Sequence, residues 1–130
     1  MPAVKRALIS ALMVCAVHAA FADKSYVDGH GGTWDCAKDA SVTIMHGNGK
    51  YTFKGACKDI TVNGGHNTLA IENAATLTIN GSSNTVTADT VDTVSVTGSD
   101  NKVTWKKSGG TGGKPTVTTL GQNNAVTAGK

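Results

Sequence analysis

Carboxylates are the side chains of this sequence that could act as acids or bases. Enzymes that cleave polysaccharides need two facing carboxylates, or a carboxylate-bound metal beside a basic proton acceptor. Asp89 and Asp92 lie close together, and Asp59 falls near Asp92 in the register of the repeat described below. Turns also use aspartate for structural reasons alone, and the other acidic residues are scattered. We therefore expect no enzyme and no catalytic residue, with a carbohydrate-active protein as the alternative.

Histidines and cysteines form a second set of chemically capable residues, because both can ligate metals. Zinc sites usually draw their ligands from close pairs such as C-x2-C or H-x3-H. No such pair occurs among the histidines and cysteines that follow the first 22 residues, which are His30, Cys36, His46, Cys57 and His66. The sequence therefore predicts no metal and no other cofactor. A metal-binding protein that uses His46 and His66 remains the alternative.

The N-terminus has the three parts of a secretory signal peptide. Lys5 and Arg6 precede an apolar run at 7–17, and small residues end at Ala22. The run is shorter than the roughly 20 residues that span a bilayer, so we do not expect an integral membrane protein. Residues 1–22 are predicted to be a signal peptide, with lipid attachment at Cys15 as an alternative. We then expect the protein to be exported, either to the periplasm or to the extracellular space or cell surface.

The charge of the exported chain is close to neutral. Removing Lys5 and Arg6 from the 12 basic residues leaves 10 against 9 acidic residues. A phosphate-binding surface needs clustered lysine and arginine. We expect no nucleic-acid partner.

Two cysteines remain beyond the signal peptide, Cys36 and Cys57. An exported protein with an even cysteine count forms disulfides by default. A Cys36–Cys57 bridge would close a loop of about 20 residues and would contribute about 3 kcal/mol in the chain-entropy model.

A repeat of fixed length dominates the rest of the chain. The segments NGGHNTLA, NGSSNTVT and TGSDNKVT follow one another at 17-residue intervals. A glycine-rich insertion at 107–115 lengthens the next interval to 23, and Gly49 holds the asparagine place of an earlier, degenerate copy. The recurring asparagines are Asn67, Asn84, Asn101 and Asn124. Self-similarity at a fixed period indicates a stacked architecture of about five units.

Each unit contains two runs in which apolar β-branched residues alternate with polar ones, which predicts short strands. A solenoid, unlike a sandwich, requires the same residue at the same place in every coil, because equivalents stack about 4.8 Å apart. We therefore predict an all-β, single-domain β-solenoid of about five 17-residue coils. We expect it to be right-handed, as parallel crossovers are. Residues near 88–93 supply a third side.

The asparagine column is predicted to do two things. Asparagine tolerates the left-handed conformation at turns, and stacked amides can hydrogen-bond along a ladder. We expect a structural ladder of these asparagines, an N-terminal cap at 23–41 and solenoid repeats over 42–130. The last repeat suggests a register slip around Leu120.

The repeats also carry a family pattern. Residues 81–105 read GSSNTVTADTVDTVSVTGSDNKVTW, and residues 116–127 read TVTTLGQNNAVT. They share a G-x-x-N-x-V motif, tandem V-x-V strands and a final L-G-x-x-N-x-V unit. On these motifs, residues 36–128 resemble an exported bacterial family, domain of unknown function 3060. The resemblance implies a secreted β-helical domain and carries no catalytic residues over.

Outward threonines form the one patterned surface that the sequence predicts. Thr76, Thr78, Thr85 and Thr87 flank inward apolar residues, and further hydroxyls extend the ranks at Thr61, Ser95, Thr104 and Thr127. Such ranks are similar to ice-binding surfaces, although threonine is also a good exposed strand former, and Lys50, Asp59 and Lys102 interrupt them. We expect a non-enzymatic structural or binding module whose partner is an unidentified envelope polymer or protein, with ice binding as a minor alternative.

Overall fold

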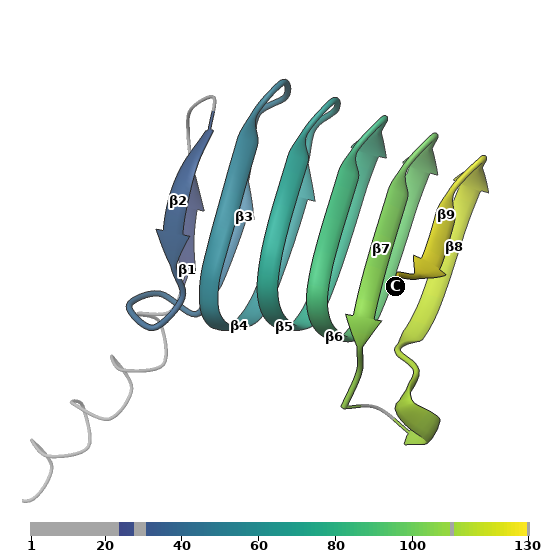
Figure 1. Cartoon of the computed structure of the whole chain (residues 1–130). Coiled ribbons are helices and arrows are strands. Elements are labelled where there is room, and N and C mark those ends of the chain that lie inside the picture. Colours follow the sequence, from purple (N-terminus) through teal and green to yellow (C-terminus); the bar gives the residue numbers. More distant parts are fainter. Residues whose placement is uncertain (1–23, 28–30, 110, 130) are drawn as a thin grey trace, which may run out of the picture.

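The computed structural model describes residues 24–27, 31–109 and 111–129. They form strands of one sheet that winds into successive coils, seen side by side in Figure 1. The elements are β1 (Lys24–Val27), β2 (Gly31–Asp35), β3 (Ser41–Ile44), β4 (Lys50–Asn63), β5 (Thr68–Ser82), β6 (Thr85–Ser99), β7 (Lys102–Lys107), a 3-10 turn η3 (Thr111–Gly113), β8 (Thr116–Gln122) and β9 (Ala125–Ala128). The signal peptide predicted at 1–22, and Cys15 within it, lie outside the described residues.

Every pairing between these strands is parallel and follows the repeat. Between β5 and β6 each residue pairs with the residue 17 positions later, from Thr68↔Thr85 to Ser82↔Ser99. Strand β6 then pairs with β7 along its first half and with β8 along its second half. The insertion at 107–115 lies between β7 and β8, so it leaves the coil register intact. The predicted all-β solenoid with coils of about 17 residues is confirmed.

The strands are longer than the sequence suggested. Each of β4, β5 and β6 runs for 14 or 15 residues and includes both apolar runs of its unit in one bent strand. Between the two runs, one further side chain points inward in each coil: Cys57, Ala74 and Val91 are all buried. Pairing continues through this region, as Ala74↔Val91 shows. The predicted third side is therefore a short bend with a single inward position.

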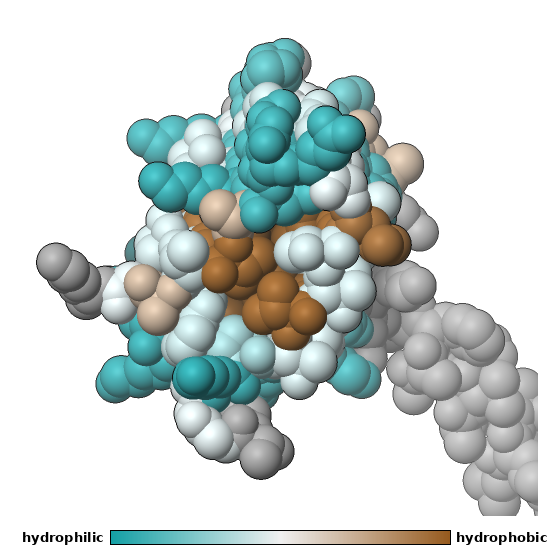
Figure 2. Space-filling view, turned by 90° about the vertical axis from the view of Figure 1, so that its right-hand side faces the viewer, coloured by the Kyte–Doolittle hydropathy of each residue, from teal (hydrophilic) through white to brown (hydrophobic). Residues whose placement is uncertain are grey.

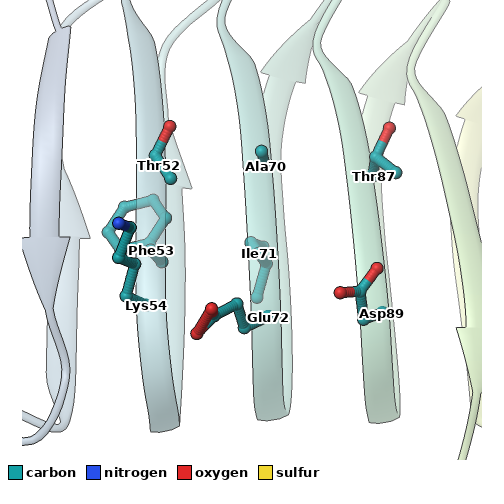
Figure 3. Close-up of a pocket in the computed structure, with 8 residues that line it drawn as sticks. All are labelled: Thr52, Phe53, Lys54, Ala70, Ile71, Glu72, Thr87 and Asp89. Atoms are coloured by element: carbon teal, nitrogen blue, oxygen red, sulfur yellow. The ribbon is translucent and has the colours of Figure 1, made fainter.

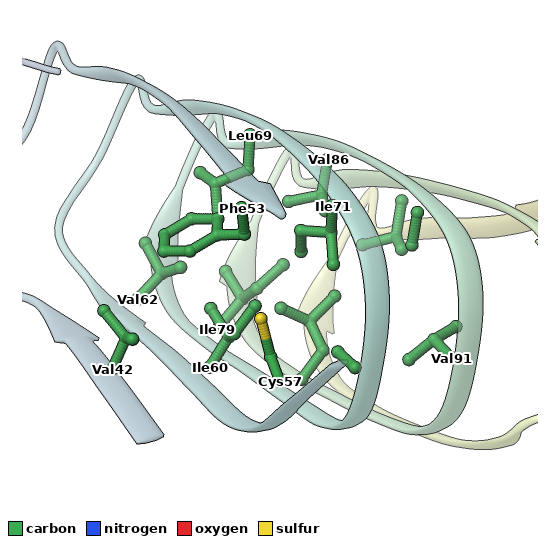
Figure 4. Close-up of a cluster of buried hydrophobic side chains, with 14 of the residues drawn as sticks. Val42, Phe53, Cys57, Ile60, Val62, Leu69, Ile71, Ile79, Val86 and Val91 are labelled. Carbon is green, nitrogen blue, oxygen red and sulfur yellow. The ribbon is translucent and has the colours of Figure 1, made fainter. Parts of the chain in front are cut away.

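The core is a set of apolar columns inside the coil (Figure 4). Side chains from successive strands stack along its length, and the largest fully buried ones include Phe53, Ile60, Leu69, Leu77 and Ile79. Alternation places every second residue inside, because successive strand side chains point to opposite faces. Each fully buried aliphatic side chain contributes about 1.5–3 kcal/mol. Burial of these columns therefore stabilises the stack of coils.

The segment expected as an N-terminal cap extends the sheet. Strand β1 pairs with β3 at the same 17-residue offset, beginning at Lys24↔Ser41, and β2 pairs with β4. These pairings add a further, incomplete coil before β3. Among the described residues, no helix has the length and apolar character to cross a membrane.

The last coil keeps its register, so the predicted slip around Leu120 is wrong. Leu120 pairs with Thr97 and takes an outward position, where it is 62% exposed. The inward place beside Val96 is held by Thr119 instead. Figure 2 looks onto this end of the coil and shows apolar side chains gathered at its centre.

Candidate functional site

The turns that join successive coils depend on the asparagine column. Asn67, Asn84 and Asn101 are 0–1% exposed. The left-handed conformation predicted for them belongs instead to the residue before each one, with φ of 59° at His66 and 57° at Ser83. The prediction of left-handed asparagines is therefore wrong. Each of these asparagines directs its side chain into the coil from a backbone without positive φ. The residue before it adopts the positive φ instead.

The amide of Asn84 shows how the column connects three coils. Its Oδ1 accepts the backbone N–H of Asn67 at 3.0 Å. Its Nδ2 donates to the carbonyl of Gly64 at 2.9 Å and to Oδ1 of Asn101 at 3.0 Å. Asn101 makes the equivalent bonds to Gly81 and to Asn124. The amides therefore satisfy backbone groups of buried turns, which would otherwise destabilise the fold.

The degenerate first unit joins the same network. Gly49 stands where the later units have asparagine, and its backbone N–H donates to Oδ1 of Asn67 at 3.0 Å. The network thus needs an amide only on the following coil, which explains why glycine serves at this end.

A glycine column runs beside the asparagines. Gly81 and Gly98 have φ of 152° and 131°, and a Cβ at either one would overlap the carbonyl of the glycine one coil earlier. Only glycine allows this close backbone approach. The G-x-x-N-x-V motif includes this glycine, three places before each asparagine, but the motif alone did not predict the close backbone approach.

The predicted disulfide joins Cys36 and Cys57, whose Cα atoms are 4.9 Å apart. Both residues are buried. Cys36 follows β2, and Cys57 holds the inward position in the bend of β4. The bridge therefore ties the incomplete first coil to the core.

The carboxylates considered as catalytic candidates have structural contacts. Asp92 accepts the backbone N–H of Gly109 at 2.7 Å and so holds the start of the insertion. Asp89 lies 3.4 Å from Nζ of Lys106, with both side chains half exposed. Asp59 is in register with Thr76 and Thr93, so it falls one position from the register of Asp92 and two coils away from it.

The histidines considered as metal ligands occupy different columns of the turns. His66 takes the left-handed position, whereas the carbonyl of His46 accepts Nδ2 of Asn67, the contact that Gly64 makes one coil later. His30 lies outside the described residues. Within those residues, no group of three or more metal-ligating side chains comes together.

A shallow hollow crosses three coils on one face of the solenoid (Figure 3). It forms because Ala70 stands between Thr52 and Thr87 in one outward column. A second column, with Lys54, Glu72 and Asp89, borders it. Glu72 also accepts the backbone N–H of Gly55 at 2.7 Å. We call this surface, made by the first halves of β4, β5 and β6 with β7 and β9, the mixed face.

The remaining hydroxyls form a separate surface, which we call the threonine face. It lies on β3, the second halves of β4, β5 and β6, and β8. Two adjacent outward columns make it up: Ser41, Asp59, Thr76, Thr93 and Thr116 in one, and Thr43, Thr61, Thr78, Ser95 and Thr118 in the other. The outward threonines were predicted to form one patterned surface, but Thr85 and Thr87 belong to the mixed face. Lys50 and Lys102 lie there as well.

These features define a short parallel β-solenoid whose turns are held by an internal amide ladder. Its sequence matches the model of a protein family of unknown function, DUF3060, over residues 47–87 and again over 62–123. Together the matches span more than half of the chain, and the chain belongs to this family. The overlap of the two matches is what a sequence of similar repeats produces. Neither the curated proteins nor the solved structures contain a match to this chain.

Proposed function

We propose that this protein is an exported, non-enzymatic module that binds a partner in the cell envelope, an extended polymer or another protein, through the outside of its solenoid. Export is supported by the signal-peptide pattern at 1–22 and by the Cys36–Cys57 disulfide, because disulfides persist in oxidising compartments. The periplasm and the cell surface both fit.

The acidic residues considered as catalytic candidates have contacts within the fold. Here Glu72 and Asp92 each use an oxygen to accept a backbone N–H at 2.7 Å, and Asp89 lies beside Lys106. These contacts give the carboxylates a role in holding bends and the insertion.

The observation that carries the proposal is the threonine face. Ser41 is buried, and the other nine outward positions lie on five parallel strands; eight of these nine are threonine or serine. The ladder and the buried residues between these positions fix the strands that carry it, so a partner would meet a preformed surface and ordering costs would be low.

The test is co-sedimentation of the purified chain, without residues 1–22 and with its disulfide intact, with insoluble envelope polymers. We expect retention that falls with Thr93→Lys, at the centre of the threonine face, and persists with Thr87→Lys on the mixed face. Both threonines are exposed on β6, so the two variants are matched. Polysaccharide hydrolase or lyase activity that disappears with Asp89→Ala or Asp92→Ala would instead establish an enzyme.

A further inference from the structure

The threonine face presents a two-dimensional lattice of hydroxyls. Thr76, Thr93 and Thr116 stand in register in one column, and Thr78, Ser95 and Thr118 in the next. Neighbouring strands are about 4.8 Å apart, and alternate residues of a parallel strand are about 6.6 Å apart. Both repeats are fixed by the backbone, so the hydroxyls form a grid with two constant spacings.

The grid is stiff on the scale of a side chain. Leu77 and Val94, which lie between the two columns in sequence, are fully buried and hold the strands to the core. Threonine itself has a restricted χ1 because it is β-branched. The outward groups therefore keep their positions without a partner.

Charge separates the two faces of the solenoid. Between β3 and β8 the two columns of the threonine face contain one charged residue, Asp59. The outward positions of the mixed face carry six: Lys50, Lys54, Glu72, Asp89, Lys102 and Lys106. Charged groups hold their own hydration shells, which conflict with any regular arrangement of water. A surface of methyl and hydroxyl groups does not impose this conflict.

We propose that the threonine face binds ice. This inference rests on the proposed function, because both use the threonine face as the binding surface. It adds the identity of the ligand. Planes of hexagonal ice also present water oxygens in rows that repeat along two directions. A single hydroxyl holds one water weakly, but many sites that engage one rigid lattice together reinforce each other.

The composition of the face favours ice over a polysaccharide. Sugar rings offer apolar faces on which aromatic side chains stack, and the two columns between β3 and β8 contain no aromatic residue. The hydroxyl grid instead matches a ligand that is itself a lattice of hydrogen-bonding oxygens.

The test measures ice recrystallisation and ice-crystal shaping with the purified chain lacking residues 1–22. We expect inhibition of recrystallisation and faceted crystals. Thr93→Lys should weaken the inhibition by about tenfold or more, because a desolvated charge at the ice contact is unfavourable. Thr87→Lys, on the mixed face of the same strand, should retain it. Chemical denaturation of both variants checks that each is folded.

The outcomes separate this inference from the proposed function. No effect of the wild-type chain on ice, or equal losses in Thr93→Lys and Thr87→Lys, overturns ice binding. If the chain leaves ice unchanged but binds an envelope polymer in a way that Thr93→Lys weakens, the proposed function stands and the ligand assigned here is wrong. If it neither affects ice nor binds a polymer, both proposals fail.

Discussion

The side-chain amide of Asn84 donates to Oδ1 of Asn101, 17 residues later in the sequence, across a distance of 3.0 Å. The same Oδ1 of Asn101 also accepts the backbone N–H of Asn84. One oxygen thus holds both the side chain and the backbone of the preceding turn. The contact depends on the geometry of the turn and not on the repeat length, because it recurs between Asn101 and Asn124, 23 residues apart.

Asn84→Ala should lower the free energy of unfolding by about 2–4 kcal/mol, because the buried N–H of Asn67 and the carbonyl of Gly64 each lose a hydrogen-bond partner. Asn124→Ala should have a smaller effect, about 1 kcal/mol, because Asn124 is only partly buried and water can replace its contacts. Urea denaturation with the disulfide intact compares the two variants. Near-zero losses at both positions would show that the ladder contributes nothing to stability.

The period and the ladder were readable from the sequence because the ladder bonds use an amide at the same place in successive coils. The position of the left-handed residue was not. The preceding places hold Asn48, His66, Ser83, Asp100 and Asn123, which are chemically varied, so no column appears in the sequence. Short polar residues and histidine tolerate positive φ, and solvent-facing turn positions accept any of them.

The division of the threonines between two faces was also hidden. Period-two alternation shows which residues point out within one run, but not whether two runs lie on the same side. That depends on the bend around 72–75 of β5, where the chain turns without leaving the sheet. The sequence therefore predicts which threonines point outward but not which of them share a face.

The glycine column gives a second prediction. Gly98→Ala should reduce the free energy of unfolding by more than about 2 kcal/mol, because its Cβ would overlap the Gly81 carbonyl oxygen in addition to the strain of positive φ. Gly112→Ala is the control, since Gly112 has φ of 76° but nothing within 4 Å of the added Cβ. It should lose only about 1 kcal/mol. Equal losses in the free energy of unfolding, measured by urea denaturation, would mean that the column requires glycine only for its positive φ and not for the close backbone approach.

The disulfide should contribute about 3 kcal/mol, since it closes a loop of 21 residues. The double variant Cys36→Ala with Cys57→Ala and the reduced wild-type chain should lose similar stability in urea denaturation. An unchanged denaturation midpoint after reduction would contradict this role.

The proposed export leads to a prediction for the processed N-terminus. The exported chain should begin at Asp23, because small residues at Ala20 and Ala22 fit a signal-peptidase site. Intact mass measurement of the exported protein tests this directly. A mass for a chain that begins at a lipid-modified Cys15 would establish the alternative anchor, and full-length protein retained in the cytoplasm would refute export.

The inward position in the bend gives the last prediction. Val91 is 0% exposed and pairs with Ala74 of the preceding coil, so it fills the interior where β6 changes direction. Val91→Ala should cost about 2 kcal/mol through lost burial and the cavity left behind. Thr93→Ala, two residues on and exposed, should stay within about 0.5 kcal/mol of the wild type. Chemical denaturation distinguishes the two. A loss at Val91 no larger than that at Thr93 would show that the bend is not packed as a third side of the core.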